Sequence, residues 1–468
     1  EKTKAQNILL LAASYVFYGI ADWRMLPLLI AVTAVFYWLG LSIDGANRTA
    51  PRKAALLTTA GVVLAVALLL YFKYLNFFIN SFARLFESFG LRVNITTFNI
   101  IMPAGISFFT FRLISYVVDI YRERIKPVRG IVTFAVYPSF FPTMMAGPID
   151  RPGTFIPQLE KTRAFDYALA VDGCRQILWG LFKKAVVADN AGVLVDYTWG
   201  AVQTTPAFDL LAKSFLYAVQ LYADFSGYSD MSIGVGKLLG FRITVNFKCP
   251  YFSKNIAEFW RKWHISLTSW LTDYVFMPLN ITFRNLGKCG VVFAVLINFI
   301  LVGLWHGAKW TYVVFGLYHG LLYIPFVLGG VFGRKNKPRK IKPLFVPMIN
   351  FGSLINFAPV LGTFILVSFS MIIFRAENLE AALFFIRRIF SPSVFTLPGQ
   401  APINIWNFTY LCVSIPVLFI GEWINRKEEH ALSRLPRRAC VRWLIYIIIV
   451  LLLVEAGEEP RTFVYYKF

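Results

Sequence analysis

Charged residues are scarce in this chain of 468 residues: they make up 15% of it, against about 25% in soluble proteins. Acidic residues are the scarcer kind, with 25 Asp and Glu against 47 Lys and Arg. Cysteine is rare too, and the five residues at positions 174, 249, 289, 412 and 440 form neither a CxxC pair nor a metal-ligand spacing. These shortages exclude a disulfide framework and are not typical of a soluble globular protein.

Histidine is also rare, with four residues in the chain, and three of them fall between His264 and His319. His264, His306 and His319 lack a local His-x₃-His pattern, and no carboxylate cluster accompanies them, so we predict no metal site. His430 lies in the charged stretch NRKEEHALSR, which predicts a solvated loop.

Apolar residues dominate the rest: the chain is 57% hydrophobic, and long apolar runs recur from end to end. Several runs approach the ~20 residues that a helix needs to cross a ~30 Å hydrocarbon layer. The sequence therefore predicts an all-α polytopic membrane protein with roughly 9–12 membrane-embedded segments. Because the longest polar linker covers only about ten residues, 333–342, we expect one integral-membrane domain over residues 1–468.

The net charge of +22 would suggest nucleic-acid binding in a soluble protein. In a membrane protein, basic residues gather in cytoplasmic loops, and they can also contact anionic lipids. The basic clusters at 122–129, 334–342 and 434–442 fit such loops. We therefore expect membrane lipids, and not nucleic acid, as partners of the basic residues.

Irregular segments are predicted at several places along the chain. Five prolines between residues 134 and 160 exclude a regular spanning helix, and irregular backbone at membrane depth is tolerated only inside protein or beside a cavity. The pattern at 76–90 predicts an interfacial helix, and residues 99–122 predict a span. Residues 254–279 show a helical periodicity that predicts one amphipathic helix.

His306 lies in the apolar stretch VVFAVLINFILVGLWHGAKW. The region from about 290 to 330 is long enough at ~1.5 Å per residue to cross the bilayer twice, and basic residues flank both its ends. The chain must then reverse near WHGAKWT, where Gly303 and Gly307 allow another backbone to approach. An ionisable residue inside the membrane indicates function, although a histidine that only bonds two helices stays possible.

The other candidate residues are His264, His319 and three residues of the stretch 224–230. His264 falls at the border of the apolar stripe of 254–279, where it is either functional or an interfacial, hydrogen-bonded histidine. His319 is expected to be structural. The stretch DFSGYSD at 224–230 brings Ser226, Asp224 and Asp230 close together, but no local base activates a serine. Carboxylates in an apolar region need partners, so both aspartates are expected to bond internally or to line a polar path.

Five motifs in order resemble one protein family. FWRKWHISLTSWLTDYVFMPL and LWHGAKWTYVVFGLYHG resemble the membrane-bound O-acyltransferase (MBOAT) family, and most closely its bacterial alginate O-acetyltransferase-like branch. MPAGISFFTFRLISYVVDIYR, FPTMMAGPIDRPGTFIPQL and YADFSGYSDMSIGVGKLLGF are similar to the same branch. One departure is Arg112, where the family pattern suggests an uncharged polar residue; its charge needs a partner or borders a cavity.

The resemblance implies a helical bundle around a central tunnel in the bacterial cytoplasmic (inner) membrane. It implies catalytic roles for His306, as general base, and His264. We expect substrate contacts from Trp305, Trp263, Asp230 and Ser226. Either His264 or an indole N–H, such as that of Trp263 or Trp305, is expected to position the donor or stabilise the oxyanion.

The resemblance also implies the substrates and partners. The donor is acetyl-CoA or another acyl thioester from the cytoplasmic side, with no permanently bound cofactor. The acceptor is a hydroxyl of an extracytoplasmic polysaccharide, reached directly or through a hydrolase-like acetyltransferase partner outside the membrane.

Three alternatives remain open at this point. A D-alanyl transferase for teichoic acid belongs to the same family. A proton-coupled transporter would predict matched broken helices in two halves, which the sequence lacks. A non-catalytic scaffold that docks a soluble transferase would make mutation of His306 silent.

Overall fold

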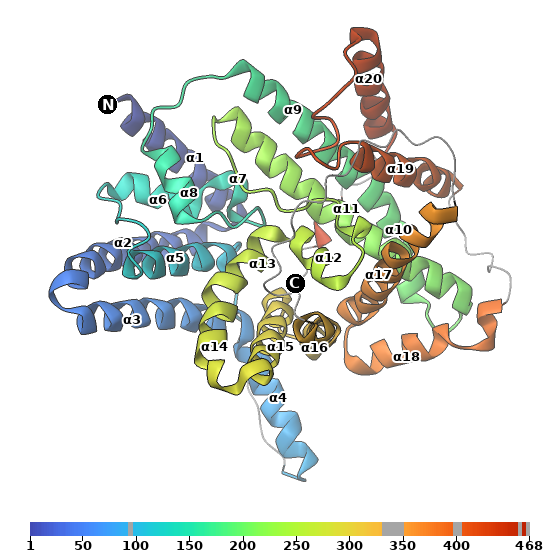
Figure 1. The fold of residues 1–468 in the computed structure, drawn as a ribbon, viewed down its shortest axis with the longest axis horizontal. Coiled ribbons are helices and arrows are strands. Elements are labelled where there is room, and N and C mark those ends of the chain that lie inside the picture. The colour runs from blue at the N-terminus through green and yellow to red at the C-terminus, as the bar shows by residue number, and fades with distance from the viewer. Residues whose placement is uncertain (92–96, 330–350, 396–404, 457–460, 465–468) are drawn as a thin grey trace. The chain divides into compact units, whose positions relative to one another are not determined.

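The computed structural model describes residues 1–91, 97–329, 351–395, 405–456 and 461–464. Every regular element in these ranges is helical (Figure 1). The chain forms two compact units: the first contains residues 1–180 and 228–245, and the second contains residues 181–227 and 246–468. Each unit is described by itself, and the single-domain expectation stays a prediction.

The first unit contains the first nine α-helices, of which α2, α3 and α5 pack together and α1 packs on α6 (Figure 1). Their bounds are α1 (Lys2–Asp22), α2 (Leu26–Thr49), α3 (Pro51–Leu69), α4 (Leu75–Ser88), α5 (Ile106–Tyr121), α6 (Ile131–Ser139), α7 (Phe141–Met144), α8 (Pro152–Leu159) and α9 (Tyr167–Leu181). A 3₁₀ turn η1 (Trp23–Met25) and a π-helix η2 (Leu70–Tyr74) join α1 to α2 and α3 to α4.

The second unit is built around the antiparallel pair α15 and α16, with α17 packed against α16. Its elements are η3 (Phe182–Asp189), α10 (Asn190–Gly200), η4 (Pro250–Phe252), α12 (Ile256–Lys262), α13 (Ile265–Leu271), η5 (Thr272–Phe276), α14 (Met277–Thr282), η6 (Arg284–Leu286), α15 (Gly287–His306), α16 (Trp310–Leu328), α17 (Phe351–Arg375), α18 (Leu379–Ile389), η7 (Pro392–Phe395), α19 (Ile405–Ile424) and α20 (Ala439–Glu455). Helix α11 (Ala207–Leu238) belongs in part to each unit.

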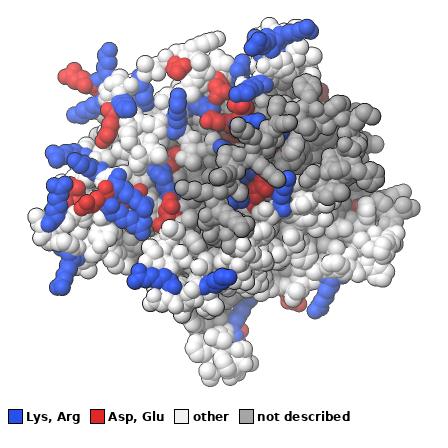
Figure 2. All heavy atoms as spheres, viewed as in Figure 1, with Lys and Arg blue, Asp and Glu red and all other residues white. Residues whose placement is uncertain are grey.

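Five helical stretches of the described residues are long and apolar enough to cross a membrane: Lys2–Thr49, Pro51–Ser88, Arg284–His306, Trp310–Leu328 and Phe357–Arg375. Many large apolar side chains on them are exposed, and on the face drawn in Figure 2 broad areas carry no charged group. Exposed apolar bands are stable when they face lipid. The chain is therefore a multi-pass α-helical membrane protein, as predicted; the number of 9–12 embedded segments stays a prediction.

The proline-rich segment is broken into the short helices α6, α7 and α8, which confirms the prediction for 134–160. The buried Arg112 of α5 organises it: its guanidinium donates to the carbonyls of Tyr137 at 3.2 Å and Pro148 at 3.1 Å, and to the hydroxyl of Thr143 at 2.5 Å. The charge of Arg112 thus has its partners in backbone carbonyls. Helix α5 covers Ile106–Tyr121 and is not among the five stretches of the described residues that are long and apolar enough to cross a membrane, so the span predicted over 99–122 stays a prediction.

Two predictions about helices and loops are wrong. The predicted helix over 254–279 is interrupted: α12 ends at Lys262, and α13 begins at Ile265. His264 between them has a left-handed backbone, with φ 45°. His430 lies in a turn region, but only 5% of it is exposed, so the charged neighbours did not indicate a solvated side chain.

The predicted reversal near His306 is confirmed, because α15 ends at His306 and α16 begins at Trp310. Gly303 allows the two helices to touch: a Cβ there would lie 2.0 Å from the carbonyl oxygen of Tyr312. A Cβ at Gly307 would lie 2.5 Å from the Tyr312 ring. Both glycines are therefore required by the close approach within this hairpin. The helix predicted at 76–90 is also present, as α4.

Candidate active site

His306 is the last residue of α15, and 6% of it is exposed. Aromatic rings surround its imidazole: Trp305 lies 5.1 Å away between ring centroids, Phe374 of α17 lies 5.0 Å away, and Phe315 of α16 lies 6.0 Å away. The hairpin and α17 together therefore hold the ring in one place.

His264 lies at the break between α12 and α13, where Asn246 fixes both the turn and the ring. The side-chain oxygen of Asn246 is 3.0 Å from His264 Nδ1, and it accepts from the backbone N–H of Ser266 at 3.2 Å and its hydroxyl at 2.9 Å. The backbone carbonyl of Asn246 accepts from the Ile265 N–H at 2.9 Å. These four contacts explain why a non-glycine residue adopts a left-handed conformation here.

The contact with Asn246 also fixes the proton on His264. The Ser266 backbone N–H can only donate, so the Asn246 amide atom that faces it is the oxygen. A carbonyl oxygen only accepts hydrogen bonds. Nδ1 of His264 therefore carries the proton, which in a neutral ring leaves the lone pair on Nε2. Burial, and secondarily the nearby His306, hold the pKa of His264 well below that of a free imidazole, so the ring is neutral.

Trp305 joins the two histidines, since its indole lies 5.1 Å from the His264 ring and 5.1 Å from the His306 ring. The structure thus brings three of the predicted site residues together. Trp263, which is 4% exposed, packs in the aromatic wall beside them: its ring contacts Phe247 at 5.2 Å, and Phe247 in turn contacts His264 at 6.3 Å.

Ser226 and Asp230 occupy different surroundings. Ser226 on α11 is 1% exposed, and its hydroxyl has no hydrogen-bond partner among the described residues. The preceding Phe225 contacts the His264 ring at 4.8 Å. Asp230 belongs to the first unit, where it accepts a hydrogen bond from Gln176 at 2.9 Å. That internal bond is one of the two outcomes predicted for this carboxylate.

His319 has a structural environment, as expected. Its Nδ1 accepts from the Trp260 indole at 3.3 Å, and its Nε2 lies 3.0 Å from the Ser370 hydroxyl. The histidine therefore connects α12, α16 and α17. Among the described residues, no group of three or more His, Cys, Asp or Glu side chains could hold a metal ion.

Two cavities of the second unit are bordered by residues next to the histidine cluster, not by His264, His306 or Trp305 themselves. The first, which we call the Trp260 cavity, has a volume of about 330 Å³ and is bordered by Trp260, Ile265 and Val302. The second, the Gln220 cavity, has a volume of about 490 Å³ and is bordered by Gln220 and Tyr312. Tyr312 also contacts the His306 ring, at 6.4 Å between centroids.

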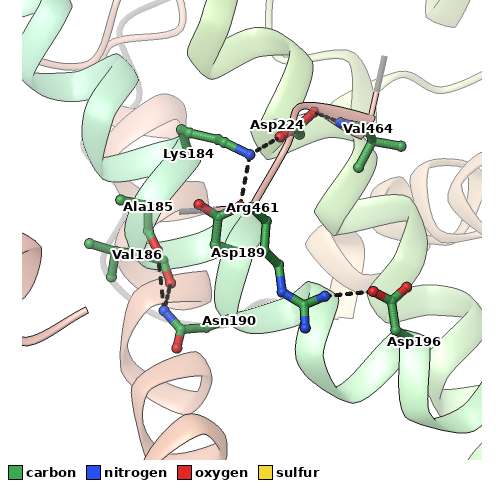
Figure 3. A network of polar contacts seen from close by, with 9 residues as sticks. All are labelled: Lys184, Ala185, Val186, Asp189, Asn190, Asp196, Asp224, Arg461 and Val464. Atoms are coloured by element: carbon green, nitrogen blue, oxygen red, sulfur yellow. Dashed lines mark hydrogen bonds and ion pairs between the residues drawn. The ribbon is translucent and has the colours of Figure 1, made fainter. Parts of the chain in front are cut away.

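A buried ion network lies beside the Gln220 cavity (Figure 3). Lys184 donates to Asp189 at 2.7 Å and to Asp224 at 2.8 Å, and Asp224 also accepts the backbone N–H of Val464 at 2.8 Å. Arg461 donates to Asp196 at 2.6 Å. Asp224 therefore bonds internally, as predicted, and residues 461–464 are tied into the second unit.

Several residues of this region have no distinctive sequence signal. Asn246 lies in FRITVNFKCP, which shows neither helical nor strand periodicity, and its partners are 18 and 20 residues away. Gln220 has a stronger sequence signal than Asn246, because it is the single amide in the apolar run YAVQLY.

Comparison with known proteins places this geometry in a family. The model of the membrane-bound O-acyltransferase family, MBOAT, matches residues 124–342, which include both histidines of the cluster. The chain is 38% identical over 388 residues to the probable alginate O-acetylase AlgI of Pseudomonas putida, covering 81% of this chain and 73% of that protein.

Two further relatives are named for different activities. The peptidoglycan O-acetyltransferase of Helicobacter pylori is 31% identical over 407 residues, covering 80% of this chain and 72% of that protein. The teichoic acid D-alanyltransferase of Streptococcus thermophilus is 31% identical over 259 residues, covering 51% of this chain and 61% of that protein. With this coverage and identity, the chain belongs to the membrane-bound O-acyltransferase family.

Proposed function

We propose that the protein is an O-acetyltransferase of the bacterial cytoplasmic membrane. It moves an acetyl group from acetyl-CoA, or another acyl thioester on the cytoplasmic side, to a hydroxyl of an extracytoplasmic polysaccharide. Relatives named as alginate O-acetylases and a peptidoglycan O-acetyltransferase support acetyl as the acyl group and a glycan as the acceptor. A hydrolase-like partner outside the membrane completes the transfer if the acetyl group passes through a protein.

One observation carries the proposal: His306 and His264 both contact the Trp305 indole at the point where α15 ends, and their neighbours Tyr312 and Ile265 each border a cavity. The Trp305 indole carries an N–H group, and both imidazole rings lie against it. In an acyl transfer the same arrangement supplies a base and an N–H group at one place.

The membrane orientation that we assign to α15 and α16 indicates which side of the membrane each cavity faces. Basic residues lie before α15, at Arg284 and Lys288, and after α16, at 334–342; by the positive-inside rule both flanks are cytoplasmic. The hairpin tip at Gly307–Lys309 then faces the opposite side, and the Gln220 cavity lies near it because Lys309 and Tyr312 border it. The Trp260 cavity borders α15 further towards the cytoplasmic end. We assign the Trp260 cavity to the donor and the Gln220 cavity to the acceptor.

The reaction needs one proton transfer and one acyl transfer. His306 takes the proton of the acceptor hydroxyl as its oxygen attacks the thioester carbonyl. The carbon–sulfur bond breaks, and the thiolate leaves with the proton from the imidazolium. The partial negative charge at the end of α15 stabilises the positive charge that develops on His306.

The oxyanion of the tetrahedral intermediate needs a hydrogen-bond donor. Neutral His264 protonated on Nδ1 offers a lone pair at Nε2 and cannot donate from there. We therefore assign the oxyanion contact to the Trp305 indole N–H and give His264 the role of holding that indole in place.

The test is transfer of radiolabelled acetate from acetyl-CoA to glycan by the purified protein in liposomes. The wild-type protein should label alginate oligosaccharides or peptidoglycan fragments, whereas His306→Ala at equal abundance should not. Transfer by the His306→Ala variant at the wild-type rate would disprove the proposed base. Label from D-alanine, and not from acetate, would instead identify a D-alanyl transferase.

A further inference from the structure

The Gln220 cavity is bordered by an amide oxygen that has no hydrogen-bond partner among the described residues. Gln220 on α11 is 5% exposed, and its side-chain oxygen is buried without a hydrogen bond to any described residue. A buried amide oxygen that makes no hydrogen bond costs free energy, about 1–3 kcal/mol. Gly192 keeps the space beside this amide open, because a Cβ there would lie 2.8 Å from the Gln220 amide nitrogen. The packing thus preserves an amide oxygen that is open to a hydrogen bond from a ligand.

The same cavity contains a guanidinium in a fixed orientation. Arg375, the last residue of α17, lies 4.8 Å above both the Trp199 and Tyr217 rings and is ion-paired with Asp196. Asp196 is held in turn by Arg461 (Figure 3). A guanidinium has five N–H donors in one plane, so this clamp sets the direction in which Arg375 can donate.

The position of the cavity connects it to the reaction. Tyr312 borders the cavity and contacts His306, and Lys309 at its edge is the residue just before α16. Arg375 ends α17, which returns across the membrane after the basic stretch 334–342. On the orientation assigned above, all three belong to the extracytoplasmic side.

We propose that the Gln220 cavity binds a sugar residue of the acceptor polysaccharide, with Gln220 accepting a hydrogen bond from a sugar hydroxyl and Arg375 donating one to a sugar oxygen. This inference rests on the proposed function and adds the acceptor subsite to it. Bound there, the sugar presents a hydroxyl past Tyr312 to His306.

The lining favours a sugar over an acyl chain or a lipid. An amide, a guanidinium, an ammonium and two carboxylates, those of Asp196 and Glu377, border a volume of about 490 Å³. Small-ligand sites fall within about 300–1,000 Å³, so one or two sugar rings are of suitable size. A buried acyl chain would leave the Gln220 amide oxygen without a hydrogen bond, whereas each hydroxyl of a sugar both donates and accepts.

The test compares acceptor and donor kinetics in liposomes, with alginate oligosaccharides and peptidoglycan glycan fragments as soluble probes and acetyl-CoA as the donor. Gln220→Leu should raise the acceptor KM or lower the acceptor kcat/KM at least tenfold, while the KM for acetyl-CoA stays within twofold. Lys309→Ala, a change at an exposed residue, should change the acceptor KM or kcat/KM in the same direction but by a smaller factor.

A matched control distinguishes binding from folding. Ser368 on α17 is equally buried, its hydroxyl has no hydrogen-bond partner among the described residues, and it does not border the cavity. Ser368→Ala should leave both KM values unchanged. If Gln220→Leu does not fold, the test uses Gln220→Glu, which keeps an oxygen that accepts hydrogen bonds. Gln220→Glu should then retain more acceptor binding than the double variant Lys309→Ala/Arg375→Lys.

The outcomes separate this inference from the proposed function. Acetyl transfer by the wild-type protein with unchanged acceptor kinetics in both Gln220→Leu and Lys309→Ala would overturn the sugar subsite and leave the acetyltransferase intact. Transfer only to a serine of an added partner protein, with none to either glycan probe, would likewise overturn it. Failure of the wild-type protein to transfer acetyl to anything would instead contradict the function itself.

Discussion

Replacing Asn246 should separate positioning from catalysis, because this side chain touches His264 but lies outside the proposed reacting groups. Asn246→Ala removes three contacts of one oxygen: the His264 ring at 3.0 Å and the Ser266 backbone and hydroxyl at 3.2 and 2.9 Å. At about 1 kcal/mol net for each buried hydrogen bond, the expected loss of stability is about 3 kcal/mol.

The effect on activity should exceed what lower abundance explains. Of the four contacts that residue 246 makes at the left-handed turn, only the backbone hydrogen bond from the Ile265 N–H to its carbonyl remains in Asn246→Ala, so the His264 ring should no longer hold the Trp305 indole 5.1 Å away. A misplaced oxyanion donor costs about 10²–10³ in kcat, so we expect a fall of at least tenfold per folded molecule. The assay is acetyl transfer in liposomes, normalised to monodisperse protein from size-exclusion chromatography, with thermal unfolding measured alongside.

Ser266→Ala is the matched control for Asn246→Ala. It removes one of the three hydrogen bonds, at about 1 kcal/mol, but keeps the bond between Asn246 and His264. Its kcat should stay within about fivefold of the wild-type value if each bond contributes about 1 kcal/mol or less to positioning. If Asn246→Ala unfolds more easily yet transfers acetyl at the wild-type kcat, the positioning argument is refuted.

The remaining predictions concern three other positions. Trp305→Phe keeps an aromatic ring between the histidines but removes the indole N–H, so kcat should fall about 10²–10³-fold with the donor KM little changed; an unchanged kcat would exclude Trp305 as the oxyanion donor. Gly303→Val would place side-chain atoms where a Cβ alone already lies 2.0 Å from the Tyr312 carbonyl oxygen, so folded protein should be lost, as measured by size-exclusion chromatography. Arg112→Met removes the guanidinium that donates to the buried carbonyls of Tyr137, Thr143 and Pro148, and leaving these carbonyls without a donor should lower the free energy of unfolding by about 3 kcal/mol or more; an unchanged thermal unfolding would show that the proline-rich segment does not depend on Arg112.

The sequence predicts the hairpin at His306 because two local signals agree there: an apolar region twice the length of one span, and basic residues at both ends. Prolines predict the breaks between α6, α7 and α8 for a reason that is equally local, the missing N–H and the fixed φ. Both features depend on residues close together in the chain, so composition and spacing suffice to find them.

The break at His264 could not be predicted in the same way. The helical periodicity of apolar residues continues through Trp263 and His264, and the left-handed turn there depends on Asn246, which is 18 residues earlier in the chain. The Gln220 cavity is harder still, since its walls come from α10, α11, α16 and α17. The prediction that His430 is solvated is wrong for a related reason: charged neighbours in the sequence do not reveal which side chain the turn buries.

The central claim is that His306 is the base, and acetyl transfer by His306→Gln tests it most directly. The variant keeps a polar side chain of similar length but cannot take the acceptor proton near neutral pH; His430→Gln, a buried histidine outside the cluster, is the control. At equal folded protein, we predict that His306→Gln transfers less than about one hundredth of the wild-type label, in line with the 10²–10⁴-fold contribution of a positioned base, whereas the control transfers normally. Wild-type transfer by His306→Gln would contradict the account.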